Sequence, residues 1–162
     1  MEKYCFRLVK KEELKDVLLL YKNALEEEFC VWNEEYPSEF EINNDYLNNN
    51  LFVLLIDDKV IGALSLVDEN ELDDYNGWII KDNYIEMARV VISKFYHGKN
   101  LAKLMVESII KECIKRKYKS IHIACQVDNI PAIKTYQQVG FSFYDKVSLF
   151  NNIYYMCEYI LS

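Results

Sequence analysis

The feature that most constrains the fold of this sequence is a strand–helix–strand succession near its middle. Residues 84–92 form a mainly apolar run typical of a strand, and residues 121–126 alternate as a second strand does. Between them lies an amphipathic helix, whose apolar side chains recur at helical spacing: Ala102, Met105, Val106, Ile109, Ile110 and Cys113. Because two strands joined through a helix usually run parallel, we expect one parallel pair in the sheet.

The rest of the chain predicts antiparallel strands joined by short turns. Ser38 and Glu41 form a capping box that begins a helix, and Gly140 is a typical residue at a helix end. We expect further strands at residues 5–9, 51–56, 60–66, 141–149 and 153–160, and further helices at 12–27, 38–50 and 129–139. This order predicts an α/β (α+β) fold, in which a mixed, mostly antiparallel sheet of about seven strands is flanked by about four helices. We expect residues 1–162 to form a single domain.

The composition narrows the classes of function. The chain of 162 residues is 51% hydrophobic, which suffices for a core without disulfides, and it has no apolar run long enough to span a membrane. Five scattered cysteines and two histidines lack metal-binding spacing, so we expect no metal and a reducing, cytoplasmic location. A net charge of −7 disfavours nucleic acid and would suit a cationic substrate, although solubility alone also explains it. We therefore expect neither a nucleic acid nor a membrane as partner.

A basic loop that contains glycine connects the strand at residues 84–92 to the following helix. It includes His97, Gly98, Lys99 and Asn100. The first amides of a helix have no partner within the helix, and together with the helix dipole they favour an anion. The loop carries neither a nucleoside triphosphate fingerprint nor a dinucleotide fingerprint. On these residues alone, the diphosphate of another carrier and an ordinary strand-to-helix turn both remain open.

Two segments resemble motifs of the GNAT superfamily of N-acetyltransferases. The loop is similar to the family's pyrophosphate motif, Gln/Arg-x-x-Gly-x-Gly/Ala, with His97, Asn100 and Ala102 at the defined positions. His97 and Asn100 depart from the usual residues, but asparagine tolerates the left-handed backbone that glycine adopts. Residues 128–141 resemble the family's Asn-x-x-Ala-x-x-x-Tyr-x-x-x-Gly-Phe helix, and the order of elements agrees over essentially the whole chain.

The resemblance implies acetyl-coenzyme A as the cofactor and a set of residues that bind it. In the family, backbone groups of the strand before the loop bind the pantetheine arm and the acetyl carbonyl. The asparagine of the second motif contacts the arm, and its tyrosine lies near the sulfur. The implied cofactor-binding residues are Val90, Val91, Ile92, His97, Gly98, Lys99, Asn100, Leu101, Ala102, Lys103, Asn129 and Tyr136.

Acetylation of an amine requires a base and an acid. An alkyl ammonium group has a pKa of about 10 and must lose a proton before it attacks, and the departing thiolate must gain a proton. We expect Tyr136 to be the acid, the alternative being a buried helical aromatic. For the base we expect Glu86, whose strand neighbours are apolar, and some family members carry a similar glutamate. The alternatives for Glu86 are a solvated strand position and a ligand of a cationic substrate.

We expect two segments to recognise the acceptor. Trp32 and Tyr36 follow the first predicted helix, and residues 68–75 form an acidic stretch. Aromatic rings and carboxylates together would suit an ammonium group. A packed tryptophan and a solvated acidic loop are the alternatives.

The sequence therefore predicts an enzyme that transfers acetyl from acetyl-coenzyme A to the primary amine of a small molecule, directly and in a ternary complex. A protein or peptide N-acetyltransferase and a non-catalytic acyl-coenzyme A-binding module are the alternatives. The resemblance also implies a homodimer through the final strands, for which Tyr154, Tyr155 and Tyr159 are candidates, with core packing as the alternative.

Overall fold

The computed structural model describes residues 3–68 and 71–161. Its strands are β1 (Tyr4–Leu8), β2 (Leu51–Ile56), β3 (Lys59–Val67), β4 (Tyr84–Ile92), β5 (Ser120–Gln126), β6 (Ser142–Leu149) and β7 (Asn152–Ile160). Its helices are α1 (Leu14–Ala24), α2 (Glu39–Leu47), α3 (Leu101–Lys115) and α4 (Ile130–Val139), with short 3₁₀ helices η1 (Lys11–Glu13) and η2 (Lys94–Tyr96). The strands of the described residues form a seven-stranded sheet in the order β1-β2-β3-β4-β5-β7-β6, in which β4 is parallel to β5.

The chain divides into two compact units that alternate along the sequence. The first unit comprises the described residues up to Leu66 together with Arg89–Met105. The second unit comprises the described residues between Val67 and Ala88 and those from Val106 onward. Strand β4 and helix α3 therefore contribute residues to both units.

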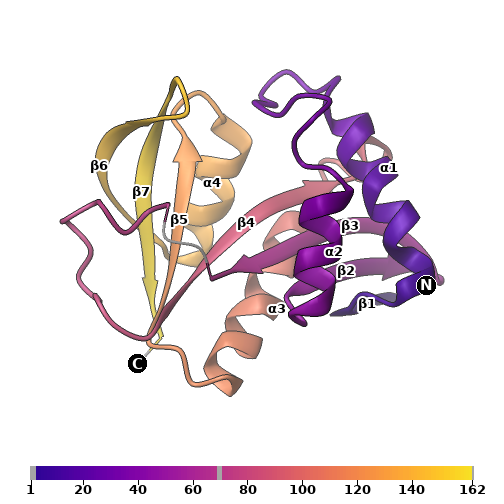
Figure 1. The fold of residues 1–162 in the computed structure, drawn as a ribbon, viewed down its shortest axis with the longest axis horizontal. Coiled ribbons are helices and arrows are strands. Elements are labelled where there is room, and N and C mark those ends of the chain that lie inside the picture. Colours follow the sequence, from indigo (N-terminus) through magenta and orange to yellow (C-terminus); the bar gives the residue numbers. More distant parts are fainter. Residues whose placement is uncertain (1–2, 69–70, 162) are drawn as a thin grey trace. The chain divides into compact units, whose positions relative to one another are not determined.

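The first unit is built on the antiparallel strands β1, β2 and β3. Helices α1 and α2 lie over one face of these strands (Figure 1). The buried side chains that form this core include Val17, Leu20 and Tyr21 of α1, Ile42 of α2, and Leu51, Val53, Leu55 and Ala63 of the strands. The predicted capping box begins α2, since Ser38 Oγ accepts from Phe40 N at 3.2 Å and Ser38 N donates to Glu41 Oε1 at 2.8 Å.

In the second unit, the two faces of the strands are covered by different elements. Met156 of β7 is paired in register with Ala124 of β5, the neighbour of Cys125, so Met156 and Cys125 point to opposite faces. On one face, Trp78 of the loop before β4 packs against Met156. On the other face, Tyr136 of α4 interacts electrostatically with Cys125.

The predicted fold class, the order of elements and the parallel pair are confirmed. The first helix is shorter than the prediction of residues 12–27, because it begins as η1 and α1 ends at Ala24. Helix α2 ends at Leu47 rather than at residue 50, and Asn49 has a left-handed φ of 57°, which a helix cannot continue through. No helix in the described part of the chain has both the length and the apolar character needed to cross a bilayer.

Candidate active site

The basic loop after β4 lies in the first unit and leads from η2 into the first turn of α3. Gly98 and Asn100 both have left-handed backbone, with φ of 78° and 59°. Asn100 thus adopts the conformation expected for it in place of a glycine. A Cβ atom added to Gly98 would meet no atom within 4 Å, so the loop is open at this point. An open loop followed by the first amides of a helix fits the diphosphate of a coenzyme.

The polar side chains of this loop differ in their contacts with the rest of the protein. Nε2 of His97 lies 3.0 Å from the carbonyl oxygen of Ile92 and 3.6 Å from Oε1 of Glu27. Nζ of Lys99 lies 5.5 Å from the centre of the Tyr96 ring, and Lys99 is exposed. His97 therefore ties the loop to the end of β4, whereas the charge of Lys99 faces solvent beside the helix start.

The end of β4 offers backbone rather than side-chain groups. Val91 is buried, and Val90 and Ile92 are half-buried. The strand then closes onto β3, since Ser93 N donates to the carbonyl oxygen of Ile61 at 2.7 Å. In the first turn of α3, Leu101 is buried, and Ala102 and Lys103 are half-buried. Because the side chains of residues 90–92 are aliphatic, their amides and carbonyls are the polar atoms that this stretch has for a ligand.

A buried ion pair that the sequence analysis did not anticipate precedes these residues. Arg89 has a left-handed φ of 52°, and its Nη2 lies 2.8 Å from Oδ2 of Asp45 in α2, each side chain being 3% exposed. Ser65 Oγ donates to the same carboxylate at 2.7 Å. Burial acts to lower the pKa of Arg89, but Asp45 and Tyr36 together more than offset this, so the pKa is raised and the guanidinium stays charged. A lone arginine in an apolar strand indicates a buried ion pair, but the sequence does not identify its partner, which lies 44 residues away.

The structure places the predicted acceptor residues Trp32 and Tyr36 in the first unit. The ring of Trp32 packs edge-on against Tyr21, with centroids 5.3 Å apart, and is half-buried against the core of this unit. This position agrees with the alternative of a packed tryptophan. Tyr36 is 41% exposed, and its hydroxyl accepts a hydrogen bond from Nη1 of Arg89 at 2.9 Å. Of the two residues, Tyr36 therefore keeps the larger exposed fraction for a ligand.

Glu86, the predicted base, lies on the part of β4 that belongs to the second unit. It is half-buried and is the partner of His122 in the parallel ladder between β4 and β5. This ladder begins at Tyr84 and ends at Glu86. Paired residues of neighbouring strands point to the same face, so Glu86 shares a face with His122.

Tyr136, the predicted acid, lies on α4 and is 9% exposed. Its ring centre lies 5.5 Å from that of Phe141. Burial, with smaller contributions from Cys125 and Cys157, raises the pKa of the phenol, so the hydroxyl is protonated near neutral pH. His122 and Cys125 are three residues apart on β5, so their side chains point to opposite faces of the strand. Glu86 shares the face of His122, and Tyr136 lies on the side of Cys125, so Glu86 and Tyr136 lie on opposite faces of β5.

Asn129 forms the N-terminal cap of α4. Its Oδ1 accepts a hydrogen bond from Ala132 N at 3.2 Å, and the helix ends at Gly140 with φ of 115°. Both helix ends agree with the sequence analysis. A contact between Asn129 and a pantetheine arm stays a prediction.

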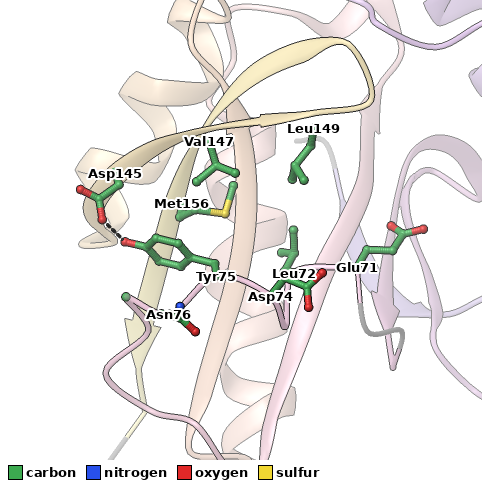
Figure 2. A pocket seen from close by; sticks show the side chains of 10 residues that line it. Glu71, Leu72, Asp74, Tyr75, Asn76, Asp145, Val147, Leu149 and Met156 are labelled. Carbon is green, nitrogen blue, oxygen red and sulfur yellow. Dashed lines mark hydrogen bonds between the residues drawn. The ribbon is translucent and has the colours of Figure 1, made fainter.

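A cavity of about 600 Å³ lies in the second unit, where the loop before β4 faces β6 and β7 (Figure 2). The lining carboxylates are Glu71, Asp74 and Asp145, and the lining apolar side chains are Leu72, Val147, Leu149 and Met156. The Tyr75 hydroxyl donates to Oδ2 of Asp145 at 2.5 Å, and burial together with this bond raises the pKa of Tyr75 to about 12. The predicted acidic stretch therefore forms one wall of the cavity, in its described part from residue 71.

A second buried polar cluster lies beside this wall and was also missed from the sequence. His122 and Glu158 are 0% and 1% exposed, and Nε2 of His122 lies 2.9 Å from Oε2 of Glu158. The imidazole is stacked between the rings of Trp78 and Tyr84, with centroids 3.8 Å and 4.3 Å away. Glu158 shares its strand face with Met156, and a carboxylate beside an apolar core position is the signal that could have indicated the cluster.

Known proteins resemble this chain in sequence. The sequence model of the acetyltransferase (GNAT) family matches residues 17–141. A stretch of 64 residues is 36% identical to the Bacillus subtilis subsp. natto (strain BEST195) protein named "Probable spermine N(1)-acetyltransferase", covering 39% of this chain and 42% of that protein. The match thus spans less than half the length of that relative.

Solved structures resemble it in fold. The GNAT family acetyltransferase of Streptococcus agalactiae 2603 has a TM-score of 0.82 at 22% identity, covering 97% of this chain and 95% of that one. The N-acetyltransferase of Staphylococcus aureus Mu50 has a TM-score of 0.78 at 19% identity, covering 99% of each chain. The protein yncA of Salmonella typhimurium, solved with its cofactor acetyl-CoA, has a TM-score of 0.77 at 15% identity, covering 99% and 95%. Because the family match covers most of the sequence, this chain belongs to the acetyltransferase (GNAT) family and has the fold of acetyl-coenzyme A-dependent N-acetyltransferases.

Proposed function

We propose that this chain transfers the acetyl group of acetyl-coenzyme A to a primary amine of a small, cationic molecule such as a polyamine. The family match supports the acetyl transfer, and the lining of the cavity in the second unit is the observation that favours a cationic acceptor. Carboxylates attract ammonium groups, and apolar walls suit the methylene chains between them. The relative named for spermine acetylation is consistent with this class of acceptor.

The donor side of the proposal rests on the loop of the first unit. The amides from Gly98 to Ala102 bind the diphosphate at the start of α3, and Lys99 adds positive charge. The backbone of residues 90–92 binds the pantetheine arm and the acetyl carbonyl, and an amide directed at that oxygen stabilises the negative charge that develops on it. Acetyl-coenzyme A supplies an activated acyl group with a thiolate as the leaving group.

On the acceptor side, Glu86 removes a proton from the ammonium group. With a pKa of about 10, only about one alkyl amine in a thousand is unprotonated near neutral pH, so a positioned base raises the fraction that can attack. The cavity lies on the same face of the second unit as Glu86. Its wall residue Tyr75 contacts Trp78, with centroids 5.0 Å apart, and Trp78 stacks on His122, the ladder partner of Glu86.

Tyr136 returns a proton to the departing thiolate. Its raised pKa makes the free phenol a weaker acid than tyrosine in water, but the same low-dielectric surroundings also raise the pKa of a thiol beside it. Burial therefore keeps the proton on Tyr136 until a thiolate forms. Transfer to that thiolate moves the negative charge to the phenolate oxygen of Tyr136, which then regains a proton, while the amine nitrogen releases its second proton as the amide forms.

The test is release of free thiol from acetyl-coenzyme A with a panel of acceptors that contains spermine, neutral amino acids and a peptide with a free N-terminus. We expect spermine to give the fastest release. Replacing Tyr136 by phenylalanine should lower kcat by about 100-fold and leave the affinity for acetyl-coenzyme A unchanged. A preference for the peptide would indicate a protein or peptide N-acetyltransferase. Intact acetyl-coenzyme A binding without release from any acceptor would indicate a non-catalytic module.

The carboxylates of the cavity give a second, independent test of the acceptor. We expect Glu71→Gln and Asp74→Asn each to raise the KM for spermine and to leave the KM for acetyl-coenzyme A unchanged, because they remove attraction for one substrate only. An unchanged KM for spermine in both variants would overturn the cavity as the acceptor site and leave the acetyl transfer itself in place.

The proposal also includes a cytoplasmic location and a homodimer. The five cysteines are all free thiols, which supports the cytoplasm, where thiols stay reduced. Tyr155 packs against Phe143 within the second unit, with centroids 5.5 Å apart, so a homodimer through the final strands rests on the family resemblance alone. Size-exclusion chromatography with light scattering tests it directly.

A further inference from the structure

We infer that Glu158 and His122 are positioning residues, which hold the segment 71–80 in place as the wall of the acceptor cavity. The inference rests on the proposed function for the role of the cavity. The anchoring of the segment does not depend on the proposed function, because it follows from the contacts of Glu158 and His122.

The carboxylate of Glu158 accepts hydrogen bonds from several elements of the second unit at once. Oε1 accepts from Ile79 N at 2.9 Å and from the Tyr144 hydroxyl at 2.8 Å. Oε2 accepts from Ile80 N at 3.1 Å and from Ser120 Oγ at 2.7 Å. Two of these donors are consecutive backbone amides of the loop. A loop outside any strand has thereby acquired a fixed attachment to β7.

His122 adds the second attachment. Its Nε2 is placed to donate to Oε2 of Glu158, and one face of its ring is covered by Trp78 of the loop. Burial lowers the pKa of His122 against the opposing effect of Glu158, so the imidazole is neutral and holds its proton on Nε2. The carboxylate is the charged partner, since its hydrogen bonds outweigh the effect of burial and lower the pKa of Glu158.

Contacts within the loop connect the anchored residues to the cavity. Trp78 Nε1 donates to the carbonyl oxygen of Leu72 at 2.9 Å, and the ring of Trp78 meets that of Tyr75 edge-on. Leu72 and Tyr75 both line the cavity (Figure 2). The pair therefore fixes Ile79, Ile80 and Trp78, and Trp78 in turn fixes the part of the loop that faces the acceptor.

Glutamine is the informative replacement for Glu158. It has the size of glutamate, but one of its two terminal groups is an NH₂ donor. Whichever way the amide is turned, that donor would face a loop amide, at Ile79 on one side or at Ile80 on the other. Glu158→Gln should thus loosen the loop without opening a hole in the core.

Kinetics with spermine and acetyl-coenzyme A test the positioning role. We expect Glu158→Gln to raise the KM for spermine by about tenfold, the loss expected when hydrogen bonds to a charged group are broken, while the KM for acetyl-coenzyme A changes by less than about twofold. Asp82→Asn is the matched control, because Asp82 lies in the same loop but pairs with Lys119 at the surface. It should leave both KM values unchanged. A parallel rise in both KM values, or an unchanged KM for spermine, would overturn the inference.

Amide hydrogen exchange tests the anchor without any ligand. In the unmodified protein, we expect the amides of Ile79 and Ile80 to exchange at least about tenfold more slowly than those of Asn76 and Gly77. Equal exchange would overturn the anchor, and this holds even if Glu158→Gln does not fold. If the protein does not acetylate spermine, the proposed acceptor fails, whereas slow exchange at Ile79 and Ile80 would still support the anchor.

Discussion

Each compact unit buries a carboxylate, and the two carboxylates are stabilised differently. Asp45, in the first unit, is neutralised by the guanidinium of Arg89 and accepts one further bond from Ser65. Glu158, in the second unit, has no cation within hydrogen-bonding distance among the described residues, and it is stabilised by neutral donors. A buried charge can thus be balanced by one opposite charge or by many dipoles.

The difference has a physical meaning for what each carboxylate can do. An ion pair joins two points, and here it ties α2 to β4 within the first unit. A carboxylate with several neutral donors can join several elements at once, and here it ties a loop to three strands. We therefore expect the first arrangement to act mainly on stability and the second mainly on the shape of the cavity.

The largest effect is expected from breaking the ion pair of the first unit. Replacing Asp45 by leucine leaves Arg89 buried without its counter-charge, which should lower the free energy of unfolding by about 3 to 5 kcal/mol. Denaturant-induced unfolding measures this loss. The double variant Asp45→Leu with Arg89→Met is the control, and it should recover most of the stability because no charge remains buried. A single variant as stable as the double one would contradict the role of the pair.

An intermediate effect is expected from acid on the second unit. The pKa of His122 is lowered from 6.5, mainly by burial, so below pH 6.5 the unfolded chain binds a proton more readily than the folded one. Stability should therefore fall as the pH drops below 6.5, at a rate of at most about 1.4 kcal/mol per pH unit. The pKa of Glu158 is lowered from 4.5, so the stability it supplies is present above pH 4.5 and is lost at lower pH.

The groups that face this pair are Trp78, Tyr84, Tyr144 and Ser120, with Asp73 acting at longer range. Unfolding measured between pH 7 and 5 should show the decrease in the unmodified protein and a flatter profile in His122→Gln. The other histidine provides the control, and His97→Gln should keep the decrease. A steeper profile in His122→Gln would contradict the assignment.

The smallest expected effect is the difference in stability between two serine variants, one in each unit. Ser65 and Ser120 are both 0% exposed, and each donates to the buried carboxylate of its unit at 2.7 Å. A carboxylate has about four acceptor positions, so a donor to the crowded Glu158 is more easily spared than a donor to Asp45. We expect Ser65→Ala to cost about 2 kcal/mol of unfolding free energy and Ser120→Ala about 1 kcal/mol. The reverse order in denaturant unfolding would contradict this explanation.

Much of the fold was readable from the sequence, because it is encoded by neighbours in the chain. Ser38 with Glu41 predicted the start of α2, and Gly140 predicted the end of α4. The left-handed backbone of Asn100 followed from its place in a loop where glycine is usual. Each of these features depends on contacts within a few residues, where propensity and capping rules apply.

The polar clusters of both units could not be read in the same way. Arg89 and Asp45 are 44 residues apart, and Glu158 is 79 residues from Ile79, so no local pattern joins them. The alternation along β7 places Glu158 on the face of Met156, but it does not say that a loop from before β4 would cover that face. Only the topology of the sheet brings these partners together.

The placement of Glu86 and Tyr136 on opposite faces of β5 constrains where the reacting carbon can lie in the second unit. Direct transfer joins the amine nitrogen to the same carbon that releases the sulfur, so under the proposed roles one carbon is served from both faces. A strand pair separates the two faces along its whole ladder, and the β4–β5 ladder ends at Glu86. Under those roles the acetyl carbon therefore lies at that end of the ladder.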